Sequence, residues 1–263
     1  MAEACITVKD LTMTYGDFVI QRNLNFTINR GDVFIIMGGN GCGKTTLLRH
    51  MIGLKAPAQG DVCYGDQGLW QADPKTRQSM LARTGVLFQS GALLSSMTLA
   101  ENVALPITEA THLSAKKVRE IVSYKLALVG LAGFEDYYPS ELSGGMQKRA
   151  GLARAMALDP EILFFDEPSA GLDPITAKLL DDLILSLSSS LSATIVVVTH
   201  DLDSIFAIGN NAVFLDAETR TNIDWGSPQK LLNESTHANV IRFLTRGDQA
   251  GRNSNNRQAR SEA

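Results

Sequence analysis

A glycine-rich segment early in the chain has the residues needed to bind a triphosphate. Residues 38–46 read Gly-Gly-Asn-Gly-Cys-Gly-Lys-Thr-Thr and fit the phosphate-loop pattern of a glycine, four residues and Gly-Lys-Thr. Glycines let successive backbone N–H groups point at phosphate oxygens, and the positive end of a following helix adds attraction. The alternative, a merely flexible glycine loop, is disfavoured by the apolar run before the motif and the helix-like run after it. In this pattern the Lys44 ammonium reaches the β- and γ-phosphates and the Thr45 hydroxyl ligates Mg²⁺. The candidate nucleotide-binding residues here are Gly38, Gly39, Asn40, Gly41, Cys42, Gly43, Lys44, Thr45 and Thr46.

Two adjacent acidic residues form a second candidate site. Asp166 and Glu167 follow the apolar run 162–165 and precede Pro168. Neighbouring side chains on a strand face opposite ways, so both can serve one site only if the strand ends there, which Pro168 favours. Nucleotide sites in open α/β sheets lie at the carboxyl ends of strands. We therefore expect Asp166 to hold Mg²⁺ and Glu167 to orient and deprotonate a water; the alternative is an ordinary acidic turn.

Continuous apolar runs predict the strands that must position these groups. Residues 33–37, 162–165 and 195–198 have no polar face, which is typical of parallel strands covered on both sides. Helical stretches separate the three runs, so the pattern predicts an α/β fold with a parallel sheet. A short β-prone run at 5–8 and alternation through 18–28 predict further strands in the first quarter of the chain.

Helical spacing dominates the middle of the chain. Ser114 is a good N-cap for an apolar periodicity that Gly130 can close, and further helices are predicted at 145–158 and 181–191. The serine run 188–190 is expected to end the last of these. We expect residues 90–158 to form a helical subdomain inserted into a domain spanning 1–245. Residues 246–263 lack large apolar side chains and are expected to be a mobile tail.

Composition restricts the class of protein. The 263 residues are 44% hydrophobic and 20% charged, and 24 basic against 28 acidic residues give a formal net charge of −4, so a nucleic-acid partner is not expected. We find no signal sequence and no apolar run long enough to cross a bilayer, so a membrane role requires a partner. Three scattered cysteines favour neither disulfides nor zinc, and the helix start beside Cys42 is expected to lower its pKa and make it alkylatable.

Residues 142–146, Leu-Ser-Gly-Gly-Met, resemble the Leu-Ser-Gly-Gly-Gln signature of the ATP-binding-cassette (ABC) family. The resemblance covers residues 5–245 and implies an ATPase with a P-loop NTPase (RecA-like) α/β core, an N-terminal antiparallel β subdomain and an inserted α-helical subdomain. Other motifs match in order: Tyr15 resembles the adenine-stacking aromatic, Gln89 the Q-loop glutamine, 169–173 the D-loop and His200 the switch histidine. The alternatives are a packing aromatic for Tyr15, a loop residue for Gln89 and a helix-starting residue for His200.

The resemblance also implies how the site is completed. In the family two cassettes pair head to tail, and the signature of one subunit closes over the ATP of the other. Such a pairing would bring Ser143, Gly144 and Gly145 to the partner's nucleotide and place Asp173 near the interface between the two subunits. The departures are Met146 for the usual Gln and Gly39 for Ser, Pro or Asn. The implied catalytic residues are Glu167, His200, Lys44 and Gln89, and the implied Mg²⁺ ligands are Thr45, Gln89 and Asp166.

Residues 87–94 and 142–149 resemble more narrowly the ATPases of the Mla and Mce lipid-transport systems. This implies a peripheral subunit on the cytoplasmic side of the inner membrane of a diderm bacterium, driving phospholipid transfer between membranes. The implied partners are a second copy, transmembrane permease subunits, a periplasmic Mce-domain protein and in some systems a small STAS-domain subunit. Residues 90–102 are expected to line the groove for the permease. The alternatives are an ABC ATPase for another substrate, a soluble ABC ATPase acting on DNA or ribosomes, and a module that binds ATP without turnover.

Overall fold

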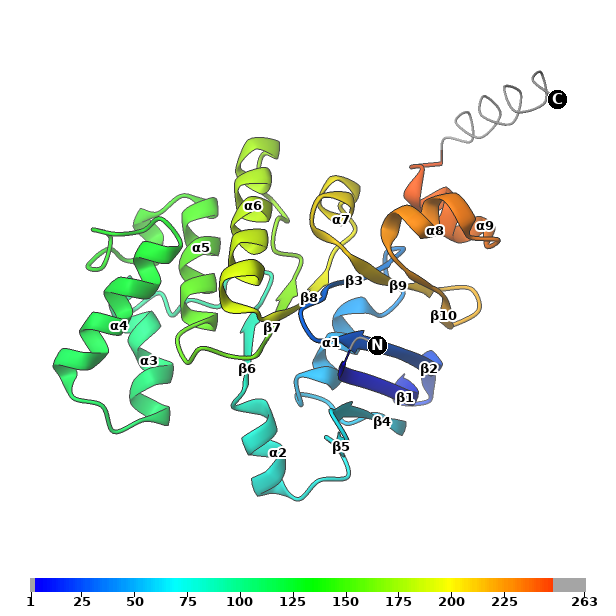
Figure 1. The fold of residues 1–263 in the computed structure, drawn as a ribbon, viewed down its shortest axis with the longest axis horizontal. Coiled ribbons are helices and arrows are strands. Elements are labelled where there is room, and N and C mark those ends of the chain that lie inside the picture. Colours follow the sequence, from blue (N-terminus) through cyan, green and yellow to red (C-terminus); the bar gives the residue numbers. More distant parts are fainter. Residues whose placement is uncertain (1–2, 248–263) are drawn as a thin grey trace.

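Two sheets organise residues 3–247, the part of the chain that the computed structural model describes (Figure 1). One sheet is antiparallel, in the order β2-β1-β4-β5, as the resemblance implied for the N-terminal region. The other has the order β10-β9-β3-β8-β7-β6, and its strands are parallel except for β10. The strands are β1 (Ala4–Tyr15), β2 (Phe18–Asn29), β3 (Val33–Gly38), β4 (Gln59–Tyr64), β5 (Gln67–Gly68), β6 (Thr84–Leu87), β7 (Ile162–Asp166), β8 (Thr194–Val198), β9 (Asn211–Asp216) and β10 (Thr221–Gly226).

The three predicted parallel strands are confirmed as β3, β7 and β8. They are adjacent and fully buried, with Ile35 opposite Val197 and Leu163 opposite Ile195. Because the strands are parallel, their carboxyl ends meet at one edge of the sheet. The phosphate loop, the acidic pair and His200 each lie at one of these ends.

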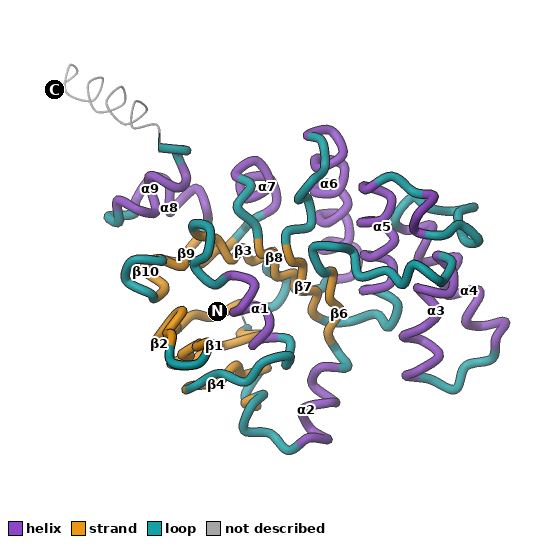
Figure 2. Tube along the Cα trace, turned by 180° about the vertical axis from the view of Figure 1, so that it is seen from behind, coloured by secondary structure: helices purple, strands orange, loops and turns teal. Residues whose placement is uncertain are grey.

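Helices lie on both faces of the parallel sheet and beyond its β6 edge (Figures 1 and 2). α1 lies between the two sheets, while α6 and α7 cover the opposite face of the six-stranded sheet. α3, α4 and α5 form the helical region at the far side of the molecule, and within Leu99–Ala155 the structure has no strand. The helices are α1 (Lys44–Met51), α2 (Pro74–Leu81), α3 (Leu99–Ala110), α4 (Ala115–Leu128), the 3-10 helix η1 (Pro139–Glu141), α5 (Gly144–Ala155), α6 (Pro174–Leu191), α7 (Leu202–Ile208), α8 (Pro228–Glu234) and α9 (Ala238–Leu244).

Several predicted boundaries were wrong. β1 continues to Tyr15 because it pairs with both β2 and β4. α6 begins seven residues earlier than predicted, since Asp173 caps it and Pro174 starts it, and the serine run 188–190 remains helical. α5 ends at Ala155 rather than near Leu158. The N-cap at Ser114 is confirmed by its bond from Lys117 N at 3.4 Å. The tail expected over 246–263 lies outside the described residues, apart from Arg246 and Gly247.

Alternation along β3 divides the interior into two cores. Val33, Ile35 and Met37 pack with α6, α7 and the helical region. Phe34 and Ile36 pack with α1 and the antiparallel sheet, where the Phe34 ring stacks on another aromatic ring at a centroid distance of 5.6 Å. The strand that carries the phosphate loop is therefore fixed by apolar packing on both faces.

A buried carboxyl between α6 and α7 makes stability depend on pH. Asp181 Oδ2 accepts a hydrogen bond from Ser204 Oγ at 2.8 Å, while Oδ1 has no partner within the described residues. Burial raises the pKa of Asp181 from 3.8 to about 6, against the lowering effect of the Ser204 bond. The folded state therefore favours the protonated form, and its stability falls as pH rises from about 4 through 6.

We expect Asp181→Asn to remove this pH dependence. Relative to the variant, wild type should lose about 1.4 kcal/mol of unfolding free energy between pH 5 and pH 8. Urea denaturation at the two pH values measures the difference. Asp182→Asn changes the exposed neighbour on the same helix and should behave like wild type. If the difference in unfolding free energy between wild type and Asp181→Asn is the same at pH 5 as at pH 8, the assignment is contradicted.

Candidate active site

The phosphate loop joins β3 to α1 through glycines that the backbone requires. Gly38 has φ 149°, and a Cβ there would lie 2.3 Å from the Leu215 carbonyl oxygen. Gly43 has φ 101°, precedes the first turn of α1, and a Cβ there would lie 2.6 Å from Ile20 Cγ2. The loop therefore turns tightly and presents the free N–H groups of the α1 start, an arrangement suited to phosphate oxygens.

Lys44 and Gln21 fix the conformation of this loop. The buried Lys44 ammonium donates to the carbonyls of Gly38 at 2.9 Å and Gly39 at 3.2 Å. Gln21 Nε2, from β2, donates to the Cys42 carbonyl at 2.7 Å and the Asp216 carbonyl at 3.0 Å. Sequence reasoning missed Gln21; the available signal was an uncharged polar residue on a strand whose inward positions are otherwise apolar.

The end of β7 brings the predicted Mg²⁺ ligands together. Thr45 Oγ1, in the first turn of α1, donates to Asp166 Oδ1 at 3.0 Å. Asp166 is buried, and burial raises its pKa, while the Thr45 hydroxyl lowers it and the charge of Glu167 raises it further. Two hard oxygen donors therefore lie side by side at the phosphate loop.

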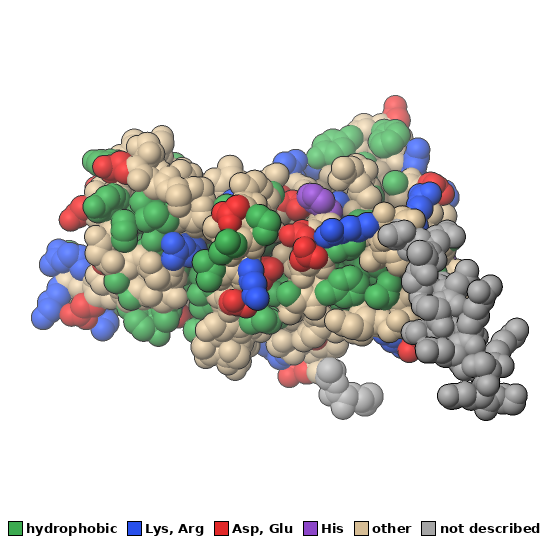
Figure 3. Space-filling view, turned by 90° about the horizontal axis from the view of Figure 1, so that it is seen from above, with side chains coloured by type: hydrophobic (Ala, Val, Ile, Leu, Met, Phe, Trp, Pro, Cys, Tyr) green, Lys and Arg blue, Asp and Glu red, His purple; other side chains and the backbone are tan. Residues whose placement is uncertain are grey.

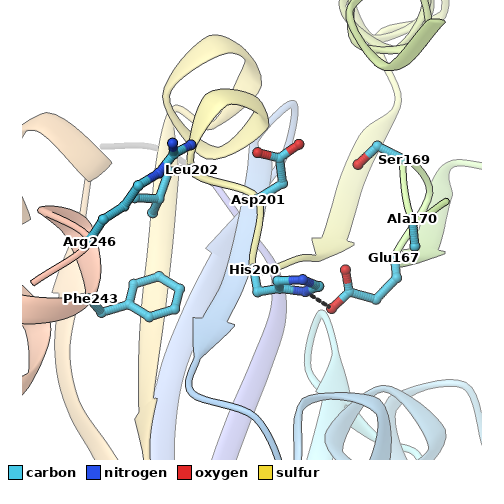
Figure 4. Close-up of a pocket in the computed structure, with 8 residues that line it drawn as sticks. All are labelled: Glu167, Ser169, Ala170, His200, Asp201, Leu202, Phe243 and Arg246. Atoms are coloured by element: carbon cyan, nitrogen blue, oxygen red, sulfur yellow. Dashed lines mark hydrogen bonds and ion pairs between the residues drawn. The ribbon is translucent and has the colours of Figure 1, made fainter. Parts of the chain in front are cut away.

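The strand ends at Asp166, as predicted, because Glu167 takes a left-handed conformation. Its φ is 50°, and its N–H donates to the Val198 carbonyl at 2.8 Å. The turn directs the Glu167 carboxylate toward the end of β8, where Oε1 lies 2.8 Å from His200 Nδ1 (Figure 4). The two side chains face each other in a pocket of about 380 Å³. His200 therefore has a side-chain partner at the strand ends, and its contact with a nucleotide stays a prediction.

The loop after β6 approaches the same turn through its main chain. The Gln89 carbonyl accepts a hydrogen bond from Lys148 Nζ of α5, and Lys148 Nζ also lies 3.5 Å from the Glu167 carbonyl. Burial lowers the pKa of Lys148, and the nearby Asp166 and Glu167 carboxylates oppose this. Sequence reasoning missed Lys148, since a lysine in an Ala/Arg-rich helix carries no signal of burial.

Tyr15 is not a core aromatic, because half of its surface is exposed at the end of β1. Its hydroxyl accepts from Arg49 Nη1 of α1 at 3.4 Å, and Lys55 Nζ lies 3.1 Å from the ring centroid. The ring therefore stands beside the helix that carries the phosphate loop, with the Lys55 ammonium over one of its faces, and its stacking on a base stays a prediction.

The signature residues lie away from the phosphate loop of the same protomer, since α5 and α1 are well separated in both views (Figures 1 and 2). Ser143 caps α5, its Oγ accepting from Met146 N at 3.3 Å. Gly144 and Gly145 form the first turn, and a Cβ at Gly145 would lie 2.4 Å from Thr176 Cγ2 of α6. In this protomer Asp173 caps α6.

The expectation of a reactive Cys42 was wrong. Its side chain is 2% exposed, and burial raises the pKa of the thiol although Lys44 acts in the opposite direction. The Sγ atom packs at Gly38, where an added Cβ would lie 2.8 Å from it. Desolvation of the thiolate outweighs the helix start, so Cys42 is a small apolar residue of the loop.

The upper face of the molecule carries mixed charges. In Figure 3 acidic, basic and hydrophobic side chains are interspersed, with an exposed histidine next to acidic groups. The described residues on this face form no broad basic area of the kind that binds nucleic acid.

Known relatives match nearly the whole chain. The MlaF ATP-binding protein of the Haemophilus influenzae intermembrane phospholipid transport system is 42% identical over 244 residues, covering 93% of this chain and 91% of the relative. MlaF of Escherichia coli K12 is 42% identical over 80% of this chain and 78% of its own length. A Mycobacterium bovis protein described as a probable ribonucleotide transport ATP-binding protein, mkl, is 38% identical, covering 91% of this chain and 66% of the relative.

Solved structures agree with these matches. CbiO1 of Clostridium perfringens, part of the ABC transporter complex cbiONQ, superposes with a TM-score of 0.80 at 27% identity, covering 92% of this chain and 95% of that one. The ATP-binding cassette MJ0796, in a dimeric post-hydrolysis state with ADP and Pi, gives 0.75 at 28% identity over 84% and 98%. A family model described as ABC transporter matches residues 21–170. The chain therefore belongs to the ABC transporter family, as an ATP-hydrolysing ATP-binding cassette.

Proposed function

We propose that this chain is the ATPase subunit of an intermembrane phospholipid transport system, acting as a head-to-tail pair on the cytoplasmic side of the inner membrane. The observation that carries the chemistry is the pairing of Glu167 with His200 at the strand ends that also bring Thr45 to Asp166. The observation that favours the substrate is 42% identity to an intermembrane phospholipid transport ATPase over 93% of the chain.

The residues at the phosphate loop fit Mg²⁺ together with a triphosphate. Mg²⁺ favours one or two protein oxygens, with phosphates and waters completing its shell. Thr45 and Asp166 supply such oxygens 3.0 Å apart, and within residues 3–247 no cluster of three His, Cys, Asp or Glu side chains offers a fuller cage. Thr45, Asp166 and Gln89 would hold the ion, which when bound neutralises charge developing on the phosphates.

Glu167 would accept the proton, and His200 would orient the Glu167 carboxylate. With Nδ1–H donating to the carboxylate, His200 fixes the direction of Glu167 Oε1. The largely buried carboxylate can then accept a proton from a water aligned with the γ-phosphate. Lys44 and the loop N–H groups would hold the phosphates, and Tyr15 would stack on the base.

The signature end of α5 would complete the site of a second copy. Ser143, Gly144 and Gly145 present a hydroxyl and free N–H groups at a helix start, which is an anion-binding arrangement. Because α5 and α1 lie apart in one protomer, a γ-phosphate can meet both only across a dimer. Asp173, at the start of α6, would lie near the seam between the copies.

A preformed surface on the loop before α3 suits a permease. The buried Asn102 amide holds the carbonyls of Leu94, Met97 and Thr98, and Asn102 Oδ1 accepts from Leu94 N at 2.7 Å. This fixed loop leaves the Leu94 side chain 40% exposed.

None of the helices within residues 3–247 is long and apolar enough to span a membrane. We assign the membrane-spanning role to permease subunits, joined by a periplasmic Mce-domain protein and a small STAS-domain subunit.

Substitution of the proposed base tests the chemistry. Glu167→Gln keeps the hydrogen bond to His200 but removes the proton acceptor, so steady-state ATP hydrolysis should fall roughly 10²- to 10⁴-fold. Size-exclusion chromatography with ATP should then detect an accumulating dimer. Glu161→Gln, at the opposite end of β7, should hydrolyse ATP at the wild-type rate. Near-wild-type turnover in Glu167→Gln would assign the base to another group.

Substitution of Leu94 tests the docking surface. Leu94→Asp places a charge on an exposed side chain and should abolish co-purification with the permease while basal hydrolysis stays within about twofold of wild type. Leu113→Asp, at a comparably exposed leucine between α3 and α4, should retain the permease. Retention of the permease by Leu94→Asp would contradict the assignment.

The transported substrate is tested on the intact complex. Purification of the wild-type assembly from native membranes in mild detergent, followed by mass spectrometry, should identify permease and Mce-domain chains together with bound phospholipid. A second candidate is ribonucleotide transport, because the mycobacterial relatives carry that description. Recovery of nucleotide cargo without enriched phospholipid would favour it.

A further inference from the structure

One side of α5 follows the main chain of the loop after β6. Lys148 Nζ donates to the Gln89 carbonyl, and Arg154 Nη1 donates to the Ala92 carbonyl. Between them, a Cβ at Gly151 would lie 2.8 Å from the Gly91 carbonyl oxygen, so the helix backbone approaches the loop closely. The spacing of three residues places these contacts on one side of the helix.

The loop needs such external support. Gly91 has φ 77° and Ala92 has φ 53°, so two successive residues are left-handed, a conformation that alanine disfavours. Glu167, a further non-glycine residue with positive φ, lies on the other side of Lys148. Both loops that carry proposed catalytic side chains are therefore held by packing and hydrogen bonds rather than by their own backbone preferences.

Lys148 differs from Arg154 in reaching both loops. Its ammonium group contacts the Gln89 carbonyl and lies 3.5 Å from the Glu167 carbonyl, whereas Arg154 contacts only the distal end of the loop. Lys148 is 7% exposed, so its ammonium group is enclosed between the main chains of the two loops. A buried cation with neighbouring carboxylates and carbonyl partners forms a compact electrostatic bridge.

We propose that Lys148 is a positioning residue for hydrolysis, which fixes the Gln89 and Glu167 main chains relative to each other and to the signature helix. Ser143, the N-cap of the same helix, lies five residues before Lys148. A shift of the helix on contact with a partner's nucleotide would therefore act on both loops, because Lys148 contacts the main chain of each. The inference rests on the proposed roles of Glu167 and Gln89.

The test compares Lys148→Met with Arg154→Met. Both remove a cation that donates to the same loop, but only the first acts on the Glu167 turn. We expect kcat of Lys148→Met to fall roughly 10- to 100-fold while KM for ATP stays within about threefold, as for a misplaced catalytic group. Arg154→Met should keep kcat within about threefold of wild type. Thermal unfolding reports the stability of each variant, and Lys148→Gln replaces Lys148→Met if the latter does not fold.

A second measurement tests whether Lys148 acts through Glu167. In the Glu167→Gln background, Lys148→Met should lower the residual rate by less than about twofold, because the group that it positions is already absent. A full independent loss in the double variant, an equal loss in Arg154→Met, or a change in KM alone would overturn the proposal. The single Glu167→Gln variant tests the proposed base without any change at Lys148. Failure of the proposed base and failure of the Lys148 proposal can therefore be told apart.

Discussion

The active site depends on three parallel strands ending at one edge of a buried sheet. β3, β7 and β8 are fixed in register and packed on both faces, so the residues that follow them have little freedom. The left-handed turn at Glu167 then converts two neighbouring acidic residues, which a continuing strand would direct to opposite faces, into partners of Thr45 and His200. Backbone geometry at the strand ends thus brings the proposed catalytic residues together.

Polar side chains that point at backbone carbonyls support this edge from outside the sheet. Gln21 holds the phosphate loop, Asn102 holds the loop before α3, and Lys148 holds the loops around Gln89 and Glu167. Each is buried and comes from an element other than the one it supports. Loops with irregular backbones thereby gain the fixed partners that buried carbonyls require.

The sequence was most informative where one residue type has one physical use. Glycines of the phosphate loop, Pro168 after the strand and the three apolar runs predicted the sheet and the edge at which the proposed site lies. Supporting residues such as Gln21 and Lys148 escaped prediction because their role comes from tertiary proximity, which no local pattern encodes. The prediction of a lowered pKa for Cys42 was wrong for a related reason. The helix start that favours a lower pKa can be read from the sequence, whereas the burial that raises the pKa is known only from the fold. The start of α6 was missed because its capping aspartate and first proline lie outside the amphipathic repeat.

The Gln21 contacts join parts of the chain that are synthesised at very different times. The phosphate loop is translated early, yet its strand β3 pairs with β8 and β9, and Gln21 reaches the carbonyl of Asp216, 195 residues later. A nascent polypeptide that ends before β9 lacks one of the two strands that flank β3 and lacks the Asp216 carbonyl that Gln21 contacts. The loop conformation seen here therefore depends on residues that are translated long after the loop itself.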